Sequence, residues 1–216
     1  MSPFERLLAI MTKPSVVIIY FIWAVLSFFY FDKPLAYYFQ SVDLRANLLL
    51  LSWITKFGLG AIYLPSFLLL ALFFRYMHKN AEWEARAWFL FLCVAIPVAI
   101  CVFLKVILGR ARPSLLFDGN LYGFYGFQMN AHFWSFPSGH TTTIIGVVLG
   151  LSIVFPRYFK ALILTGLAVA FSRVLLTHHF LSDVMIAAYL TLIEVGVILC
   201  VLRRKSWLMP AWSPVT

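Results

Sequence analysis

The longest apolar run of this chain limits its fold more than any other feature. Residues 161–202 form a largely apolar run of 42 positions, and the polar stretch within it is residues 177–183. A helix crosses a bilayer in about 20 apolar residues, so this run is too long for a single crossing. We therefore predict two membrane-spanning helices here, with the break between them at residues 177–183.

The rest of the chain has the composition of a protein with several such helices. Hydrophobic residues make up 63% of its 216 residues and charged residues 12%, which is more apolar surface than a soluble domain of this length needs. The other apolar runs that predict spans are residues 15–31, 58–74, 87–104 and 141–155. We expect one all-α membrane domain over residues 1–216, a bundle of six transmembrane helices with both termini on the same side.

A shorter apolar segment, residues 48–54, lies between Arg45 and Lys56. It is too short to cross a bilayer on its own. It is either a helix that lies in the membrane interface or the lead-in to the span that begins at Gly58.

The distribution of lysine and arginine predicts the orientation of the bundle. If the N-terminus is inside, ten of the 17 lie on inner segments: Arg6, Lys13, Arg75, Lys79, Arg86, Arg157, Lys160, Arg203, Arg204 and Lys205. Seven lie outside: Lys33, Arg45, Lys56, Lys105, Arg110, Arg112 and Arg173. The positive-inside rule then places both termini in the cytoplasm. Because the net charge of +9 is scattered at the ends of apolar runs, it indicates topology and not nucleic-acid binding.

An ionisable cluster interrupts the longest apolar run. Between residues 172 and 183 the chain carries Arg173, His178, His179 and Asp183. Such groups are costly near lipid and mark candidate functional sites. On one helix, His179 and Asp183 share a face, and a carboxylate beside an imidazole fixes its tautomer and raises its basicity. Taken alone, the stretch fits equally well a helix N-cap at Asp183 beside a buried histidine.

Two earlier stretches carry related residues. Lys105 is followed, after six positions, by Arg112 and Pro113, and residues 137–140 read Pro-Ser-Gly-His. In chain order the three motifs are Lys-x6-Arg-Pro, Pro-Ser-Gly-His and Ser-Arg-x5-His-x3-Asp. This series resembles the type 2 phosphatidic acid phosphatase (PAP2) family, which also includes glucose-6-phosphatase and vanadium haloperoxidases. The resemblance is close over residues 105–183 and covers the first hundred residues only in hydrophobic pattern.

Phosphoryl transfer requires a charge clamp around the equatorial oxygens of the phosphate. Lys105, Arg112 and Arg173 supply cations, and arginine presents a planar fork to phosphate. Ser138 offers a hydroxyl, and Gly139 lets its backbone N–H approach closely. A helix that begins there adds its positive end to the anion site.

The histidines provide the chemistry in this interpretation. His179 attacks phosphorus to form a phosphohistidine, and Asp183 orients and polarises it. His140 protonates the leaving oxygen and then helps to activate water. The resemblance implies these same roles at these same positions, with no metal ion and no cofactor.

Each motif residue also has a structural interpretation. Lys105 and Arg112 fit snorkelling residues at the interface, Pro137 to Gly139 fits a turn before a helix, and His140 fits an interfacial histidine. The completeness of all three motifs favours catalysis.

Other polar residues are less clear. Arg110 adds a phosphate contact or faces lipid headgroups. His132 and His178 lie outside the motifs and are interpreted as non-catalytic, and Ser182 as a helix cap. Glu194 lies in the last predicted span without an identifiable partner. The aromatic, glycine-containing loop at residues 115–134 is either an interfacial belt or a rim that holds a lipid headgroup.

We expect a bacterial inner-membrane enzyme, multi-pass, with its site facing the periplasm or exterior. It would hydrolyse a lipid phosphomonoester or pyrophosphate. Undecaprenyl diphosphate is favoured over lipid A, phosphatidylglycerophosphate or phosphatidic acid on topology and family habit. The alternatives are a lipid phosphotransferase that uses the same phosphohistidine, or a non-catalytic protein that binds or transports a lipid phosphate. Membrane lipids are the expected surroundings, nucleic acid is not an expected partner, and the sequence predicts no oligomeric state.

Overall fold

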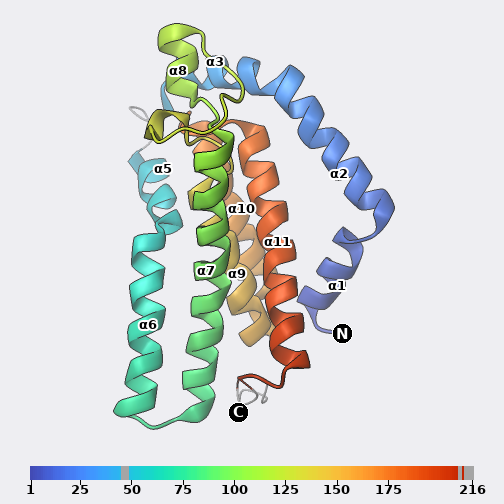
Figure 1. Ribbon diagram of the computed structural model, residues 1–216, viewed down its shortest axis with the longest axis vertical. Helices are drawn as coiled ribbons and strands as arrows, with labels where there is room; N and C mark the ends of the chain where they lie inside the picture. Colours follow the sequence, from blue (N-terminus) through green and yellow to red (C-terminus); the bar gives the residue numbers. More distant parts are fainter. Residues whose placement is uncertain (45–48, 209–210, 212–216) are drawn as a thin grey trace.

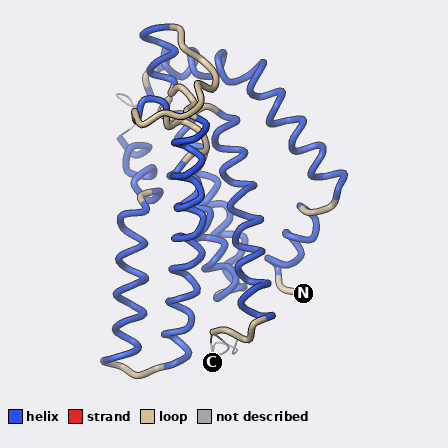
Figure 2. Tube along the Cα trace, viewed as in Figure 1, coloured by secondary structure: helices blue, strands red, loops and turns tan. Residues whose placement is uncertain are grey.

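The computed structural model describes residues 1–44, 49–208 and 211. Within these residues the chain is helical, and its only extended pairings are two isolated bridges at Arg110 (Figures 1 and 2). The predicted all-α class is confirmed for this part of the chain. Arg45 and Leu48, which entered the predicted topology, lie outside the described residues.

Four helical stretches are long and apolar enough to cross a membrane: Pro14–Val42, Ala81–Leu108 (α7), Pro156–Leu175 and Leu181–Arg204 (α11). A fifth results if the bent pair Leu51–Gly58 and Gly60–Tyr76 forms one span. The remaining predicted span is the shorter apolar helix α9, Gly139–Val154. The described chain thus has four or five spans by length and composition, and the count of six and the side of each terminus stay predictions.

The first span differs from the expectation that it ends at residue 31. Helix α2 (Pro14–Leu26) continues through a π-helical turn, η1 (Ser27–Phe31), into α3 (Asp32–Val42). The polar start of α3 did not stop the helix, because Asp32 is buried against polar partners elsewhere in the protein. Before it, the short helix α1 (Pro3–Met11) begins with a capping box between Ser2 and Glu5.

The segment before the second span is a lead-in to that span. Helix α5 (Leu49–Ile54) passes through the 3-10 turn η2 (Thr55–Gly58) and bends by 48° into α6 (Gly60–Tyr76). A Cβ at Gly58 would lie 2.8 Å from the Cβ of His140. Glycine at this position therefore lets the bend approach α9.

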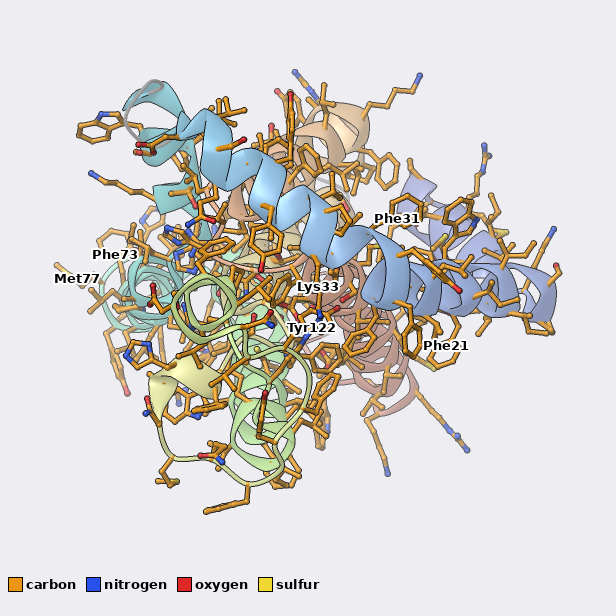
Figure 3. All side chains as sticks on the ribbon, turned by 90° about the horizontal axis from the view of Figure 1, so that it is seen from above. Phe21, Phe31, Lys33, Phe73, Met77 and Tyr122 are labelled. Carbon is orange, nitrogen blue, oxygen red and sulfur yellow. The ribbon has the colours of Figure 1, made fainter. Side chains whose placement is uncertain are left out.

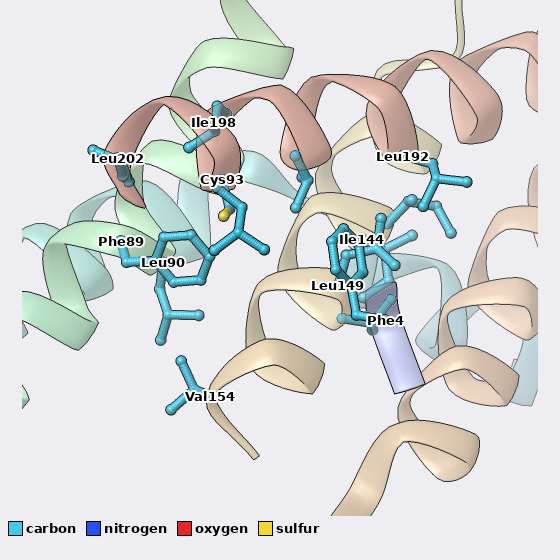
Figure 4. Close-up of a cluster of buried hydrophobic side chains, with 14 of the residues drawn as sticks. Phe4, Phe89, Leu90, Cys93, Ile144, Leu149, Val154, Leu192, Ile198 and Leu202 are labelled. Atoms are coloured by element: carbon cyan, nitrogen blue, oxygen red, sulfur yellow. The ribbon is translucent and has the colours of Figure 1, made fainter. Parts of the chain in front are cut away.

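Helix α9 is the most enclosed helix of the bundle and packs against α7, α10 (Phe159–Leu175) and α11. Close approach needs glycine here, since a Cβ at Gly146 would lie 2.4 Å from the carbonyl oxygen of Cys93. The apolar core includes Phe89, Leu149 and Leu202, and Phe4 of α1 is fully buried against it (Figure 4). This packing fixes the central helix that begins at the second motif.

The loop after α7 folds back over the end of that helix. Gly109 ends α7 in the left-handed region with φ 53°, and the backbone N–H of Gln128 donates to the carbonyl of Val106 over 2.8 Å. A Cβ at Gly109 would lie 2.0 Å from the carbonyl oxygen of Gly126, so no other residue fits. The loop contains helix α8 (Pro113–Gly119) and the 3-10 turn η3 (Ala131–Phe133).

All three motifs gather at one end of the bundle. The C-terminal ends of α7 and α10 and the N-terminal ends of α9 and α11 meet below α8, at the upper end in Figure 1, and the two termini lie toward the other end. The break between α10 and α11, residues 176–180, overlaps the predicted polar stretch at residues 177–183, and α11 begins earlier than that stretch ends. The bundle therefore has one end that carries the motifs and one that carries the chain ends.

Reporter fusions test the predicted orientation of these two ends. A fusion after Lys205 should report a cytoplasmic position and a fusion at Asn120, in the loop over the motifs, an external one, because the lysine and arginine bias places the chain ends inside. A fusion at Lys79, in the turn between α6 and α7, is the matched internal control. The reverse pattern of reporter activity would place the motif end in the cytoplasm.

Candidate active site

Lys105 joins the first motif to the second. It lies near the C-terminal end of α7 and is 8% exposed, and its Nζ donates to the carbonyl of Trp134 over 2.7 Å. Its Cε would lie 3.6 Å from a Cβ placed at Gly139. The ammonium group is therefore held beside the start of α9.

Two arginines complete the predicted clamp. Arg112 precedes α8, and its Nε donates to the carbonyl of Ala131 over 3.1 Å. Arg173, near the end of α10, is 4% exposed, and its Nη1 donates to Thr55 Oγ1 over 2.6 Å. Its Nη2 lies 2.5 Å from Nδ1 of His178, which can accept from a guanidinium only as a neutral imidazole nitrogen. Thr55 and His178 thus anchor Arg173, a role that the sequence did not predict.

The second motif forms the start of α9, as expected. Ser138 is the N-cap residue, but its side chain makes no capping hydrogen bond to the helix. Its hydroxyl accepts from Thr141 Oγ1 over 3.0 Å, and its N–H donates to the carbonyl of Asp183 over 3.3 Å. The positive end of a 16-residue helix therefore lies between the second and third motifs.

His179 lies in the short segment between α10 and α11 and is 3% exposed. Its Nδ1 lies 2.7 Å from the carbonyl oxygen of Ser135, which can only accept, so the proton is on Nδ1 and Nε2 carries the lone pair. Burial lowers the pKa of His179 well below 6.5, against the effect of Asp183, which raises it. The imidazole is therefore neutral, the state that a nucleophile needs.

Asp183 does not hold His179 in the way that the spacing suggested. Its Oδ2 lies 3.7 Å from Nδ1 of His179 and accepts from Ser135 Oγ over 2.6 Å and from the N–H of Phe180 over 2.9 Å. Asp183 thus acts on the imidazole through its charge and through Ser135, whose own carbonyl orients the ring. The bond to Phe180 comes from the third residue of α11, so Asp183 is not the N-cap residue that the structural interpretation expected, although its carboxylate satisfies the backbone N–H of the N-cap residue Phe180.

The electrostatic neighbourhood brings the motifs together. The positive charges of Arg173, Arg112 and Lys105 interact electrostatically with His140, and those of Lys105 and Arg173 also interact with His179. The histidines of the second and third motifs therefore lie within the electrostatic range of shared cations, and we call the region around Lys105, Arg112 and Arg173 the cationic pocket. Cations gathered in this way suit a bound dianion.

The amino-acid sequence of residues 86–207 matches the PAP2 superfamily. The chain belongs to this family. The match covers all three motifs, from the first turns of α7 to the end of α11, and leaves the first span, the lead-in helix α5 and helix α6 outside it.

Two curated relatives match part of the chain. Lipid A 1-phosphatase of Rhizobium etli is 36% identical over 114 residues, which are 50% of this chain and 49% of the relative. Lipid A 1-phosphatase of Rhizobium johnstonii is 34% identical over 114 residues, 50% of this chain and 47% of the relative. The match thus spans about half the length of these relatives.

A solved structure also resembles the chain. It is the first transmembrane PAP2 type phosphatidylglycerolphosphate phosphatase from Bacillus subtilis, with a TM-score of 0.49 and 19% sequence identity. The likeness covers 93% of this chain and 92% of that chain.

Arg110, which lies between two residues of the first PAP2 motif, is placed differently from the expectation. It is fully buried, and its guanidinium is paired with Asp32 and Asp183, so it faces neither lipid headgroups nor the cationic pocket. Burial alone would lower the pKa of Arg110, but the two carboxylates raise it above the ordinary value. Ser182 is not the helix cap either, since α11 begins at Leu181 after Phe180.

A small polar cavity adjoins the PAP2 motifs. Its volume is about 210 Å³, and it is lined by Arg112, Ser114, Thr177 and His178. His132 lies apart from it, in η3, where its carbonyl accepts from the N–H of Arg112. Glu194, in the middle of α11, has both carboxyl oxygens buried without a hydrogen-bond partner among the described residues.

Proposed function

We propose that the chain is a lipid phosphatase that works through a phosphohistidine at His179. The observation that carries this proposal is the neutral, buried imidazole of His179, whose Nδ1–H is held by the Ser135 carbonyl within a cationic pocket. This arrangement leaves Nε2 as the nucleophile. Membership of the PAP2 superfamily supports it.

The reaction takes two steps, transfer of the phosphoryl group to His179 and hydrolysis of the phosphohistidine. In the first, the lone pair of His179 Nε2 forms a bond to phosphorus, the bond from phosphorus to the ester oxygen breaks, and His140 gives its proton to that oxygen. In the second, water attacks phosphorus and gives a proton back to His140. The phosphorus–nitrogen bond breaks, and inorganic phosphate leaves.

The cations and the helix start hold the phosphoryl group. Lys105, Arg112 and Arg173 surround its oxygens, the Ser138 hydroxyl donates to one of them, and the Gly139 N–H adds the positive end of α9. Because these groups are fixed before substrate binds, they stabilise charge in the transition state without reorganisation.

The substrate that we propose to test first is lipid A carrying a phosphomonoester on its sugar. Two relatives that match half of the chain are named for the removal of a lipid A phosphate. The cavity beside Arg112 is lined by two hydroxyl groups and an imidazole, which suit the hydroxyl groups of a sugar. Undecaprenyl diphosphate, favoured by topology, is the second candidate.

We propose that the enzyme lies in a bacterial cytoplasmic membrane, with the motif end at the outer face. This placement rests on the lysine and arginine bias and on the spans. A single domain over residues 1–216, with six spans and both termini inside, completes the proposal.

A panel of purified lipid phosphates in detergent tests the activity. Phosphate release should be fastest from lipid A, slower from undecaprenyl diphosphate, phosphatidylglycerophosphate and phosphatidic acid, and absent in His179→Ala. Labelled phosphate that appears on a lipid hydroxyl instead of in solution would indicate a phosphotransferase. Lipid binding with neither product would indicate a non-catalytic protein.

Removal of divalent metal ions should leave the rate of phosphate release unchanged. Among the described residues, no three His, Cys, Asp or Glu side chains gather as metal ligands, and the phosphate clamp is built from Lys and Arg. The measurement is turnover with EDTA and without added Mg²⁺. Loss of activity on chelation that one metal restores would contradict this expectation.

Vanadate should inhibit the reaction, because its trigonal form imitates the phosphoryl transition state. The same measurement on Arg173→Lys, which keeps the charge but loses the planar fork, should show weaker inhibition.

A further inference from the structure

A buried charge cluster lies directly behind the PAP2 site. Asp32 is 1% exposed, and Arg110 and Asp183 are fully buried. Removing such groups from water costs several kcal/mol for each ion, roughly, so they persist only with well-placed partners. We infer that Asp32, on the first span, is a positioning residue for His179 and acts through Arg110 and Asp183. This inference deepens the proposed function and rests on it.

Arg110 divides its guanidinium between two carboxylates. Nη1 donates to Asp183 Oδ1 over 2.5 Å, and Nη2 donates to Asp32 Oδ2 over 2.7 Å. The rings of four aromatic residues surround it at 4.8 to 5.5 Å from its Cζ: Phe28, Tyr122, Phe124 and Phe180. The guanidinium is therefore fixed between the two aspartates and cannot turn toward a bound phosphate.

Asp32 also holds the start of α11 directly. Its Oδ1 accepts from the backbone N–H of Ser182 over 3.0 Å, and its Oδ2 accepts from the Ser182 hydroxyl over 2.5 Å. These bonds satisfy an N–H in the first turn of the helix that carries Asp183. A residue of the first span thus acts as the cap of the last one.

Arg110 reaches His179 by a second route, along the backbone. Its carbonyl accepts from the N–H of Ser135 over 3.0 Å. The carbonyl of Ser135 orients the imidazole of His179, and the hydroxyl of Ser135 donates to Asp183. The guanidinium of Arg110 therefore holds Asp183, and its carbonyl holds Ser135, which are the two residues beside the nucleophile.

The π-helical turn η1 aims Asp32 at this cluster. The N–H of Asp32 donates to the carbonyl of Ser27, a bond that spans five residues. One extra residue in a turn rotates the following side chains by about 100° relative to a regular α-helix, and such turns are frequent at functional sites. Tyr122 closes the cluster: its hydroxyl lies 3.1 Å from Asp32 Oδ2 and also contacts the carbonyl of Phe28.

The next residue along the helix lies outside the cluster. Lys33 is exposed, and its Nζ lies 4.8 Å from the centre of the Tyr122 ring, on the outer side that Figure 3 shows from above. Substitutions of Asp32 and Lys33 can therefore be compared as test and control, since Asp32 lies inside the cluster and Lys33 outside it.

The charge of Asp32 matters for the nucleophile. With Asp32 present, one guanidinium neutralises only part of the charge of two carboxylates, and Asp183 keeps a negative potential at His179. Without it, Arg110 would pair with Asp183 alone. The charged groups that act on His179 directly are Asp183 of α11, Lys105 of α7 and Arg173 of α10.

The test compares Asp32→Asn with Lys33→Gln. Asn keeps the shape of the side chain and loses its charge. We expect kcat for the lipid phosphate to fall about 10- to 100-fold, the range known for residues that orient the ligands of metal sites by hydrogen bonds, with KM within about threefold of wild type. The acid limb of the kcat/KM profile should move to lower pH, because protonation of His179 becomes harder. Lys33→Gln should have the kcat, the KM and the pH profile of the wild type.

A second readout does not depend on turnover. Nitrogen NMR of ¹⁵N-histidine-labelled protein reports the tautomer and titration of His179, assigned by its absence in His179→Asn. Asp32→Asn should change these signals and Lys33→Gln should not. If wild-type protein releases no phosphate but the NMR change appears, the proposed function fails and this inference stands.

Unchanged kcat and unchanged His179 signals in folded Asp32→Asn would overturn the inference. So would a loss of activity that follows only the loss of folded protein, with the pH profile intact. If Asp32→Asn does not fold, Tyr122→Phe removes the hydroxyl that contacts Asp32, Arg110 and the carbonyl of Phe28, and it keeps the ring. It should lower kcat about twofold to tenfold, the net effect typical of one hydrogen bond, and wild-type kcat and His179 signals in that variant would count against the inference.

Discussion

Replacing His179 by alanine should abolish phosphate release. The variant loses the only group that attacks phosphorus in this account, so the rate should fall by at least about 10⁴-fold, as for nucleophiles in other covalent mechanisms. The fold should persist, because His179 lies in a short connection: alanine keeps the bond from the backbone N–H to the carbonyl of Arg173 and loses the side-chain bond to the carbonyl of Ser135. The measurement is phosphate release from a lipid phosphate, together with detergent size-exclusion and thermal unfolding.

His178→Ala is the matched control for this experiment. It removes the neighbouring imidazole, which contacts Arg173 and lines the polar cavity but carries no covalent step. Its activity should fall far less than that of His179→Ala and should be lost mainly through a higher KM. Wild-type turnover in His179→Ala would refute the nucleophile assignment.

The effect of His140→Ala should depend on the leaving group. A general acid contributes about 10²- to 10⁴-fold when the leaving oxygen is an alkoxide. A nitrophenolate leaves without a proton, so its ester should lose far less of its rate of phosphohistidine formation. The measurement compares single-turnover rates on a lipid alkyl phosphate and on a nitrophenyl phosphate ester.

In His179→Ala, by contrast, both substrates should lose their rates together. Equal losses on the two substrates in the His140 variant would show that His140 has another role. A natural alternative would then be packing, since a Cβ at Gly58 would collide with His140 and the two segments fit closely.

The motifs could be recognised in the sequence because each one is local, and the resemblance to the PAP2 family and the predicted topology indicated that they lie together. The residues that they contain come from the ends of α7, α9, α10 and α11, the N-cap of α8 and the connection before α11: Lys105, Arg112, Ser138, Gly139, His140, Arg173, His179 and Asp183. The length of the apolar run and its polar interruption predicted a break between two helices at residues 177–183, which overlaps the observed break between α10 and α11. A polar stretch in a long apolar run has few physical alternatives.

The partners behind the site could not be predicted in this way. Asp32 follows an apolar run, where a single aspartate usually marks the water interface, and its partner Arg110 is 78 positions away. The only local signal was a carboxylate among the aromatic residues that end the first apolar run. The sequence around Arg110 fitted a phosphate contact and a lipid-facing position equally well, and it did not reveal the two carboxylates with which Arg110 pairs.

Hydropathy was also a limited guide to the length of helices. It ended the first span at residue 31, whereas the helix continues to Val42, because a helix can carry polar residues where tertiary partners satisfy them. Helix α9 shows the reverse: it has only 16 residues, and it is enclosed by other helices over most of its length. Helix α9 is central because α7, α10 and α11 pack around it, although it is shorter than the other helices of the bundle core.

Trapping the covalent intermediate is the most direct test of a phosphohistidine at His179. In His140→Ala with a ³²P-labelled nitrophenyl phosphate ester, the first step should proceed while activation of water is slow, so labelled protein should accumulate in a rapid quench. We predict label that survives alkali, is released by acid, and is absent from the double variant His140→Ala with His179→Ala. Phosphate release without any labelled protein, or equal label in the double variant, would contradict a phosphohistidine at His179.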